Sequence, residues 1–316
     1  MIEVDRLTKE YSGTLAVDRI SFRAEPGQIV GFLGPNGAGK TTTIRILACY
    51  LAASEGTARV AGHDVATESL AVRRNLGYLP ETNPLYPDMR VEEFLHFRAR
   101  LKGVGSRNDR RRVVDRICEL CWIDKVRTRI VGQLSKGFRQ RVGLAEALIA
   151  DPPVVILDEP TVGLDPHQVR QVRRIIRELG ERKTVLFSTH ILSEVEELCD
   201  RIIIISKGRI VADGTRDEIV AKLGARRAWR ALVDGPRDEV AAALSKIRGV
   251  VQADLRSWKG TRVDVHLWTE GSPDGFEAEV RTLAASKSWQ VSEFGSEVPD
   301  LEDLFVHLTK SEATAS

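Results

Sequence analysis

The sequence predicts an α/β chain with a smaller α+β domain at its C-terminal end, and three observations lead to this prediction. Strand-like and helix-like runs alternate over residues 1–220, which is typical of a mostly parallel sheet covered by helices on both faces. A glycine-rich loop at 34–41 follows one such strand and precedes a helix. After residue 225 the order changes to β-α-β-β-α-β, the pattern of a ferredoxin-like fold. We therefore divide the chain into domains at 1–220 and 225–316.

The elements of the first domain are predicted from short apolar runs. Strands are expected where β-branched residues cluster, at 27–33, 154–157, 184–188, 201–206 and 208–214, and the last two resemble a closing hairpin. A helix is expected at 41–51, where apolar residues recur at helical spacing. A helix-rich insert occupies about 90–150, and we interpret its basic run at 106–112 as a solvated face.

The C-terminal domain is predicted as an accessory unit. Its strands are expected at 228–235, 250–257, 262–269 and 289–294, with helices at about 236–247 and 274–287 and a last amphipathic helix at 299–310. It contains 12 Lys and Arg residues against 15 Asp and Glu, so it is slightly acidic. It shows no cluster of catalytic residue types, and we interpret His266 and the scattered tryptophans as core residues.

Composition excludes several classes of protein. With 47 Lys and Arg against 45 Asp and Glu, the net charge of +2 is too balanced for a protein that mainly coats nucleic acid. No run approaches the roughly 18 apolar residues of a membrane span, and the N-terminus is no signal peptide, so a cytoplasmic location is expected. Cys118 and Cys121 form a C-x-x-C without a second ligand pair, and we expect them to be buried helix residues.

The strongest functional signal is the phosphate-loop pattern G-x-x-x-x-G-K-[ST] between the predicted strand and helix. Glycines let successive backbone N–H groups converge on a phosphate, and the following helix adds the positive end of its dipole. Lys40 is expected to reach the β- and γ-phosphates, and Thr41 to ligate Mg²⁺. The nucleotide-binding residues predicted here are Gly34, Asn36, Gly37, Ala38, Gly39, Lys40, Thr41 and Thr42.

Two adjacent carboxylates end the predicted strand at 154–157. Asp158 lies at the carboxyl end of this strand, where ligands bind in open α/β sheets, and is expected to hold Mg²⁺. Glu159 points elsewhere and is the predicted base that polarises the attacking water.

The order of these and three further motifs resembles the ATP-binding subunits of ABC transporters. Between the phosphate loop and ILDEP stands LSKGF (134–138), which is similar to the LSGGQ signature, and GLDP (163–166) and STH (188–190) follow. The resemblance implies that Ser135 and Gly137 contact the γ-phosphate of an opposite subunit, and that Asp165 lies at the dimer interface. Ser135 also precedes a helix whose N-terminus favours anions.

The resemblance implies three further roles. His190 matches the switch histidine that bonds the γ-phosphate, and Tyr11 matches the aromatic residue that stacks on adenine. Glu81 stands where the family usually has Gln and is expected to help ligate Mg²⁺. The signature differs in Lys136 and Phe138, and together with GYLPE (77–81) it is similar to the ABC-2 branch of drug, polysaccharide and gliding-motility exporters.

The sequence thus predicts an ATP-hydrolysing subunit of an ABC exporter. Two copies would sandwich two MgATP molecules and drive a separately encoded membrane permease, so the chain would be peripheral on the inner face of the membrane. The alternative is a non-transport ABC ATPase acting on DNA or ribosomes. The DNA-repair type carries a long coiled coil between the phosphate loop and the signature, but here only 94 residues separate Lys40 from Ser135 and they show no sustained heptads. The translation-factor type has two nucleotide domains in one chain, and this chain has one. A nucleotide sensor is a third possibility, and Glu159 argues against it because a sensor needs no base.

Overall fold

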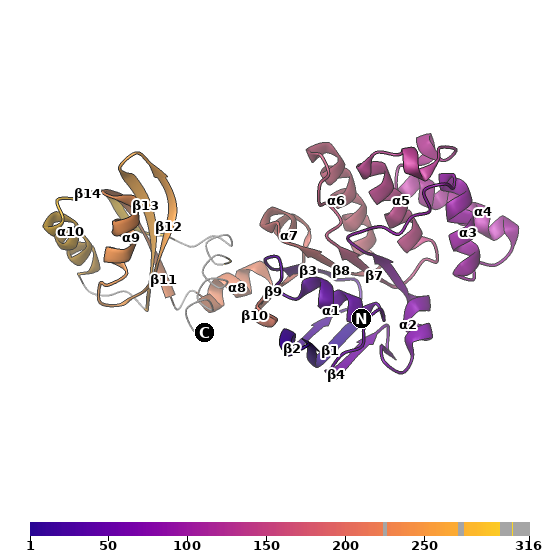
Figure 1. Cartoon of the computed structure of the whole chain (residues 1–316), viewed down its shortest axis with the longest axis horizontal. Helices are drawn as coiled ribbons and strands as arrows, with labels where there is room; N and C mark the ends of the chain where they lie inside the picture. Colours follow the sequence, from indigo (N-terminus) through magenta and orange to yellow (C-terminus); the bar gives the residue numbers. More distant parts are fainter. Residues whose placement is uncertain (224–225, 271–274, 298–304, 306–316) are drawn as a thin grey trace. The chain divides into compact units, whose positions relative to one another are not determined.

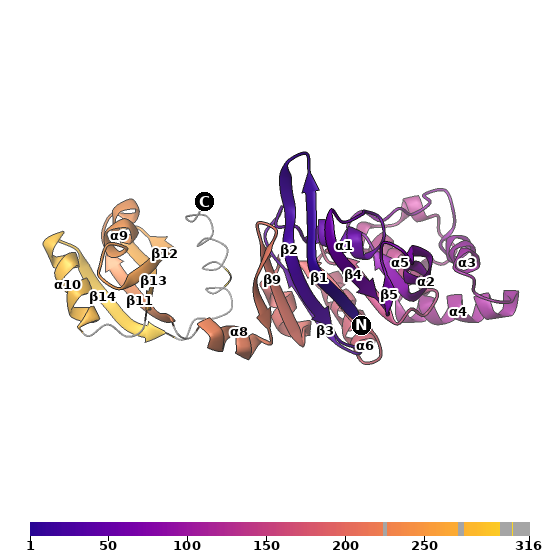
Figure 2. The ribbon, with the colours of Figure 1, turned by 90° about the horizontal axis from the view of Figure 1, so that it is seen from below.

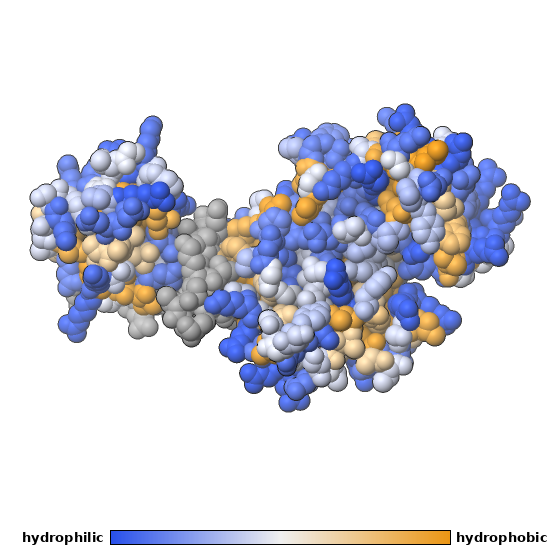
Figure 3. Space-filling model, viewed as in Figure 1, coloured by the Kyte–Doolittle hydropathy of each residue, from blue (hydrophilic) through white to orange (hydrophobic). Residues whose placement is uncertain are grey.

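The computed structural model describes residues 1–223, 226–270, 275–297 and 305. The chain divides into two compact units, Met1–Thr215 and Arg216–Ser316 (Figure 1). Among the described residues, no helix has both the length and the apolar character to cross a membrane. The face of the first unit in Figure 3 is largely hydrophilic, with separate hydrophobic patches.

An antiparallel sheet opens the first unit, and the sequence analysis had not delineated it. Its strands are β1 (Ile2–Tyr11), β2 (Thr14–Ala24), β4 (Glu55–Val60) and β5 (His63–Asp64), in the order β2-β1-β4-β5. Figure 2 shows β1 and β2 as a long hairpin. Ser12 and Gly13 both have positive φ in its tight turn, the conformation that matches the twist of paired strands.

The second sheet carries the predicted strands of the phosphate-binding domain. It consists of β3 (Ile29–Leu33), β6 (Leu76–Leu79), β7 (Val154–Asp158), β8 (Thr184–Thr189), β9 (Arg201–Ser206) and β10 (Arg209–Gly214), in the order β10-β9-β3-β8-β7-β6. All neighbours are parallel except β9 and β10, which form the predicted hairpin. Every residue of β3, β7 and β8 is buried, because helices or the other sheet cover both faces.

Helices of the first unit begin at recognisable signals. The helices outside the insert are α1 (Lys40–Leu47), α2 (Ser69–Asn75), α6 (Pro166–Gly180) and α7 (Leu192–Leu198). Asp165 caps α6 by accepting hydrogen bonds from two backbone N–H groups, and Pro166 occupies its first position. The predicted helix at 41–51 is confirmed but ends at Leu47.

The helical insert is confirmed as three helices, α3 (Val91–Leu101), α4 (Arg107–Leu120) and α5 (Lys136–Leu148). Two short 3-10 turns, at Asp124–Val126 and Val131–Gln133, connect α4 to α5. Ser106 and Asp109 form a capping box at the start of α4. Cys118 and Cys121 are buried at its end, as expected, and burial raises the pKa of Cys118 to about 11. The insert packs on the sheet through one continuous apolar core.

The second unit contains the predicted ferredoxin-like fold. Its elements are α8 (Arg216–Leu223), β11 (Arg226–Asp234), α9 (Arg237–Leu244), β12 (Val250–Lys259), β13 (Arg262–Glu270), α10 (Phe276–Ser286) and β14 (Gln290–Glu297). The antiparallel sheet order β12-β13-β11-β14 places the first and third strands at the centre. Both α9 and α10 pack on the face that carries Val233 and Val265. The predicted helix at 299–310 falls outside the described residues, Phe305 excepted.

We predict that Phe187→Ala lowers the free energy of unfolding of the first unit by about 3–5 kcal/mol, because the ring is fully buried in the central strand β8. Leu70→Ala is the control, since Leu70 is 68% exposed, and it should change that free energy by less than about 0.5 kcal/mol. Urea unfolding followed by far-UV circular dichroism measures both. Equal effects of the two substitutions would contradict this account of the core.

Candidate functional site

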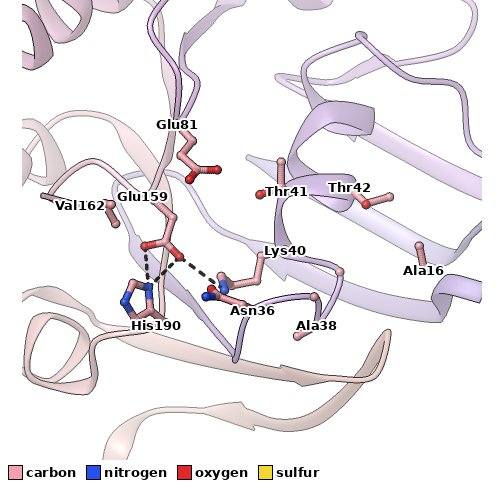
Figure 4. Close-up of a pocket in the computed structure, with 12 residues that line it drawn as sticks. Ala16, Asn36, Ala38, Lys40, Thr41, Thr42, Glu81, Glu159, Val162 and His190 are labelled. Carbon is pink, nitrogen blue, oxygen red and sulfur yellow. Dashed lines mark hydrogen bonds and ion pairs between the residues drawn. The ribbon is translucent and has the colours of Figure 1, made fainter.

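A cavity of about 390 Å³ lies where the carboxyl ends of β3, β7 and β8 meet (Figure 4). Parallel pairing aligns these ends, because Leu33 is opposite Thr189 and Asp158 is opposite Ser188. The described residues that line the cavity are Ala16, Asn36, Gly37, Ala38, Gly39, Lys40, Thr41, Thr42, Glu81, Glu159, Val162 and His190. The structure therefore brings together the loop, the acidic strand end, Glu81 and the histidine that the sequence singled out.

The glycines of the loop are required by its tight path. Gly37 and Gly39 have φ of 80° and 106°, which side chains rarely tolerate. A Cβ on Gly39 would stand 2.5 Å from the Ala16 carbonyl oxygen, and one on Gly34 would stand 2.4 Å from that of Ile205. Gly39 is the N-cap of α1, so the positive end of this helix lies at the cavity. Both features favour an anionic ligand.

Lys40 is buried, with a relative exposure of 6%, and its ammonium contacts three oxygen atoms. Nζ donates hydrogen bonds to the carbonyl oxygens of Gly34 at 2.7 Å and Pro35 at 3.2 Å. It also lies 3.4 Å from Oε1 of Glu159. A phosphate in the cavity would offer the same ammonium further oxygen partners of full negative charge.

Asp158 is buried beside two hydroxyl groups. Its Oδ1 accepts hydrogen bonds from Oγ of Ser188 at 2.6 Å and from Oγ1 of Thr41 at 3.4 Å. Its Oδ2 is buried and has no hydrogen-bond partner among the residues that the structure describes. Burial raises the pKa of Asp158, and the negative charges of Glu81 and Glu159 act in the same direction. A cation near Oδ2 would relieve all three unfavourable effects.

The donor set fits a magnesium ion that shares its coordination with phosphate and water. Within the described part of the chain, no three His, Cys, Asp or Glu side chains are close enough to hold a metal between them. Thr41 and Glu81 line the cavity, and Asp158 lies beside Thr41. The hydroxyl and carboxylate groups of these three side chains offer only oxygen ligands. Mg²⁺ prefers oxygen and is usually bound through one or two carboxylates plus substrate phosphates.

Glu159 lies between Lys40 and His190. Its carboxylate oxygens are 3.1 and 3.2 Å from Nδ1 of His190, and its backbone N–H donates to Oγ of Ser188 at 3.0 Å. Glu159 has φ of 50°, a left-handed conformation that costs on the order of 1–3 kcal/mol for such a residue. The strained backbone turns the Glu159 side chain into the cavity (Figure 4). The neighbouring Asp158 stays buried at the end of β7.

Six predicted site residues are not among those that line this cavity. Two of them, Gly34 and Asp158, adjoin it through their hydrogen bonds with Lys40 and Thr41.

The other four predicted site residues make no such hydrogen bond within the described part of the chain. Tyr11 ends β1, is 44% exposed, and has Nζ of Lys9 5.2 Å from its ring centroid. Ser135 and Asp165 are the N-caps of α5 and α6. Gly137 lies against Gln168, because a Cβ there would stand 2.2 Å from the Gln168 side-chain oxygen. These residues stay predictions.

The sequence analysis missed Ala16 and Val162, both of which line the cavity. Nothing in the sequence around Ala16 marks it, since it enters the site through the long β1–β2 hairpin. Val162 lies between Glu159 and the GLDP motif. This position between two predicted motifs is the only feature of the sequence that could have placed Val162 at the cavity.

Comparisons with known proteins agree with this geometry. A family model described as "ABC transporter" matches residues 17–162. The daunorubicin resistance ATP-binding protein DrrA3 of Streptomyces coeruleorubidus is 35% identical over 310 residues, which cover 98% of this chain and 95% of that protein. The Nod factor export ATP-binding protein I of Paraburkholderia xenovorans is 38% identical over 221 residues, which cover 70% of this chain and 72% of that protein.

Solved structures also match a large part of the chain. The ATP-binding subunit of an ABC transporter superposes with a TM-score of 0.66 at 31% identity. The match covers 71% of this chain and 93% of that subunit's chain. A dimeric ATP-binding cassette in a post-hydrolysis state bound to ADP and Pi gives a TM-score of 0.63 at 25% identity, covering 68% of this chain and 98% of its own.

We predict that Asp158→Asn stabilises the chain in the absence of ligands, and that the gain depends on pH. Because burial raises the pKa of Asp158, the folded state binds its proton more tightly than the unfolded state. Wild-type stability relative to the variant should therefore fall as the pH rises from about 3.9 to the raised pKa, and then stay constant. Thermal unfolding between pH 4 and pH 8 in EDTA measures this difference. The exposed Asp88→Asn should show no such trend, and a pH-independent gain for Asp158→Asn would contradict the assignment.

Proposed function

The chain belongs to the ABC transporter family of ATP-binding proteins and is an ATPase, and on that premise we propose that two copies sandwich two MgATP molecules and drive export through a separately encoded permease. The observation that carries this proposal is the cavity at the carboxyl ends of β3, β7 and β8, where Lys40 pairs with Glu159 and Thr41 donates a hydrogen bond to the adjoining, buried Asp158. Phosphoryl transfer to water requires a cation, a carboxylate that binds the metal ion and a base, and Lys40, Asp158 and Glu159 would supply them in that order.

The nucleotide phosphates are proposed to bind the loop Gly34–Thr41 together with Thr42. The left-handed glycines and the N-terminus of α1 support this assignment, and Lys40 would exchange carbonyl oxygens for phosphate oxygens. Thr41, Asp158 and Glu81 would hold Mg²⁺, which neutralises developing charge on the phosphates when it is bound. The orphaned Oδ2 of Asp158 supports the metal assignment.

Glu159 is the proposed general base, with His190 as its partner. The carboxylate is 7% exposed and lies against Nδ1 of His190, so its position is fixed before ATP arrives. Once Lys40 turns toward phosphate, Glu159 loses one ion-pair partner and its oxygen becomes available to a water molecule. His190 then keeps the carboxylate oriented through Nδ1, and its other ring nitrogen is proposed to hydrogen-bond the γ-phosphate.

The proposed dimer assigns a role to the residues that lie outside the cavity. Ser135, Gly137 and Asp165 lie at the N-termini of α5 and α6, where two helix dipoles favour an anion. We propose that they contact the nucleotide held by the other copy, so that ATP joins the two chains and hydrolysis separates them. Tyr11, partly exposed at the end of the β1–β2 hairpin, would stack on adenine.

A groove of about 450 Å³ on the first unit is the proposed permease site. It lies between α2, the loop after β6, and helices α3 and α5, and its described lining is Ala48, Tyr50, Leu70, Arg73, Arg74, Leu76, Tyr78, Pro80, Pro84, Arg98, Leu101, Lys102, Gly103 and Glu146. Tyr50 and Leu101 are 73% and 61% exposed, which leaves apolar surface for a partner. Pro80 and Pro84 flank Glu81, so the same loop borders the groove and the nucleotide cavity.

The charge of the groove indicates the chemistry of the permease segment. Four cations line it against one described carboxylate, Glu146, which is already paired with Arg98. Burial lowers the pKa of Lys102, so a carboxylate from a partner would stabilise its charged form. We therefore propose that an apolar permease segment with acidic residues binds here, at the cytoplasmic face of the membrane.

The domain division at 1–220 and 225–316 is also proposed rather than tested. A separate apolar core in the second unit supports an accessory domain that is not required to form the nucleotide cavity. We propose that this domain regulates or stabilises the dimer.

We predict that Glu159→Gln lowers ATP turnover by about 10²–10⁴-fold, because the amide keeps the shape of the side chain but cannot accept a proton. Its affinity for MgATP should remain within about twofold of the wild-type affinity. Steady-state phosphate release and nucleotide titration measure the two quantities, with the exposed Glu181→Gln as control. Near-normal hydrolysis by Glu159→Gln would eliminate the general-base assignment.

We predict that Lys102→Glu and Arg74→Glu abolish binding of a polytopic membrane protein, because each reverses a charge in the groove. The measurement is co-purification with MgATP from a detergent extract of the native membranes, with every variant built on Glu159→Gln. Arg111→Glu on the exposed face of α4 is the matched control and should retain the partner. Recovery of ribosomes or DNA instead would favour the non-transport class, and an unaffected partner would place the permease elsewhere.

A further inference from the structure

We propose that Asn83 is a positioning residue that ties the Glu81 loop to helix α5, so that events at the nucleotide reach the N-terminus of that helix. This inference rests on the proposed function, because it assigns the route by which one of its parts moves another. Asn83 belongs to neither the nucleotide cavity nor the described lining of the groove. It stands two residues after Glu81 and one before Pro84.

The first contact is a hydrogen bond between two side-chain amides. Nδ2 of Asn83 donates to Oε1 of Gln140 at 2.9 Å, across 57 residues of sequence. Gln140 is only 7% exposed, so water competes little for the bond. Because both groups are neutral, the bond should respond little to salt, unlike an ion pair.

The second contact is steric. A Cβ on Gly143 would stand 2.8 Å from three atoms of the Asn83 amide, so that amide lies directly on the backbone of α5. Gln140 and Gly143 are three positions apart and therefore share one face of the helix. Asn83 is thus held by α5 from two directions, and a glycine is needed for the approach.

The pair is not arranged for stability alone. Oδ1 of Asn83 is buried and has no hydrogen-bond partner among the described residues, which costs free energy. A small apolar side chain would avoid this cost at the same place. A buried unsatisfied polar group calls for an explanation. The hydrogen bond that Nδ2 of Asn83 donates to Gln140 explains why an amide is kept here despite the unsatisfied oxygen.

The link connects two places that the proposed mechanism needs to move together. Glu81 lines the nucleotide cavity, and the loop that follows it reaches α5 through Asn83. Helix α5 begins at the N-cap Ser135, five residues before Gln140, which is about 7.5 Å along a rigid helix. A displacement of the Glu81 loop therefore shifts the residues proposed to contact the nucleotide of the other copy.

The test is a set of variants that leave the nucleotide cavity intact. Asn83→Ala and Gln140→Ala each remove the hydrogen bond, and Gly143→Ala displaces the Asn83 amide from the other side. Asn75→Ala is the matched control, since its amide donates to a carbonyl of its own helix. The combined exchange Asn83→Gln with Gln140→Asn restores an amide pair of the same total length.

We expect Asn83→Ala to lower turnover about tenfold while the KM for MgATP changes less than about twofold. In the Glu159→Gln background, ATP-dependent dimerisation measured by light scattering should need a correspondingly higher chain concentration. The double alanine variant should be no worse than either single variant, and the exchanged pair should recover most of the loss. Gly143→Ala should resemble Asn83→Ala, and Asn75→Ala should resemble wild type.

Three results would overturn the inference: normal turnover and dimerisation in Asn83→Ala, multiplicative losses in the double variant, or no recovery in the exchanged pair at equal thermal stability. A merely structural role would lower the melting temperature and the affinity for MgATP together, which the KM and unfolding measurements detect. Failure of the Glu159→Gln chain with Asn83 and Gln140 intact to dimerise with ATP would instead refute the proposed function, so the two failures are distinguishable.

Discussion

The site depends on one hydroxyl group. Oγ of Ser188, at the carboxyl end of β8, donates to Asp158 and accepts from the backbone N–H of Glu159. Parallel pairing of β7 with β8 sets Ser188 opposite Asp158, so this contact is a consequence of the register. Through it, two adjacent carboxylates acquire different environments: Asp158 remains in the sheet beside Thr41, and Glu159 turns in a left-handed conformation toward Lys40 and His190.

Burial then determines what these groups can do. Asp158 has a raised pKa and an unpaired oxygen, and Lys40 shares its charge among two carbonyls and Glu159. Charged groups removed from water are favourable only when partners of opposite charge are close. The cavity is therefore electrostatically incomplete in a way that a polyphosphate with its metal ion would complete, and this is the physical basis of the proposed ATP chemistry.

The loop after β6 joins this chemistry to the rest of the first unit. Its three prolines have no backbone N–H to place in a ladder, so the segment leaves the sheet and crosses to the helical insert. Glu81 borders the cavity, Pro80 and Pro84 border the cationic groove, and Asn83 contacts α5. One short segment thus contacts all three of the regions whose movements the proposed transport cycle has to coordinate.

The sequence by itself determined the parallel strands, the helical insert, the β-α-β-β-α-β order and the identity of the phosphate loop, because each of these rests on local periodicity or local spacing. It also predicted that Lys40 and Glu159 share a site, since the ends of parallel strands meet at one edge, and the resemblance to ABC ATP-binding subunits implied that Glu81 and His190 join them. Only the tertiary structure decided the N-terminal antiparallel sheet, the entry of Ala16 and Val162 into the cavity, and the contact of Asn83 with Gln140. These features depend on pairings and side-chain contacts between distant segments, and such contacts leave no periodic trace in either segment.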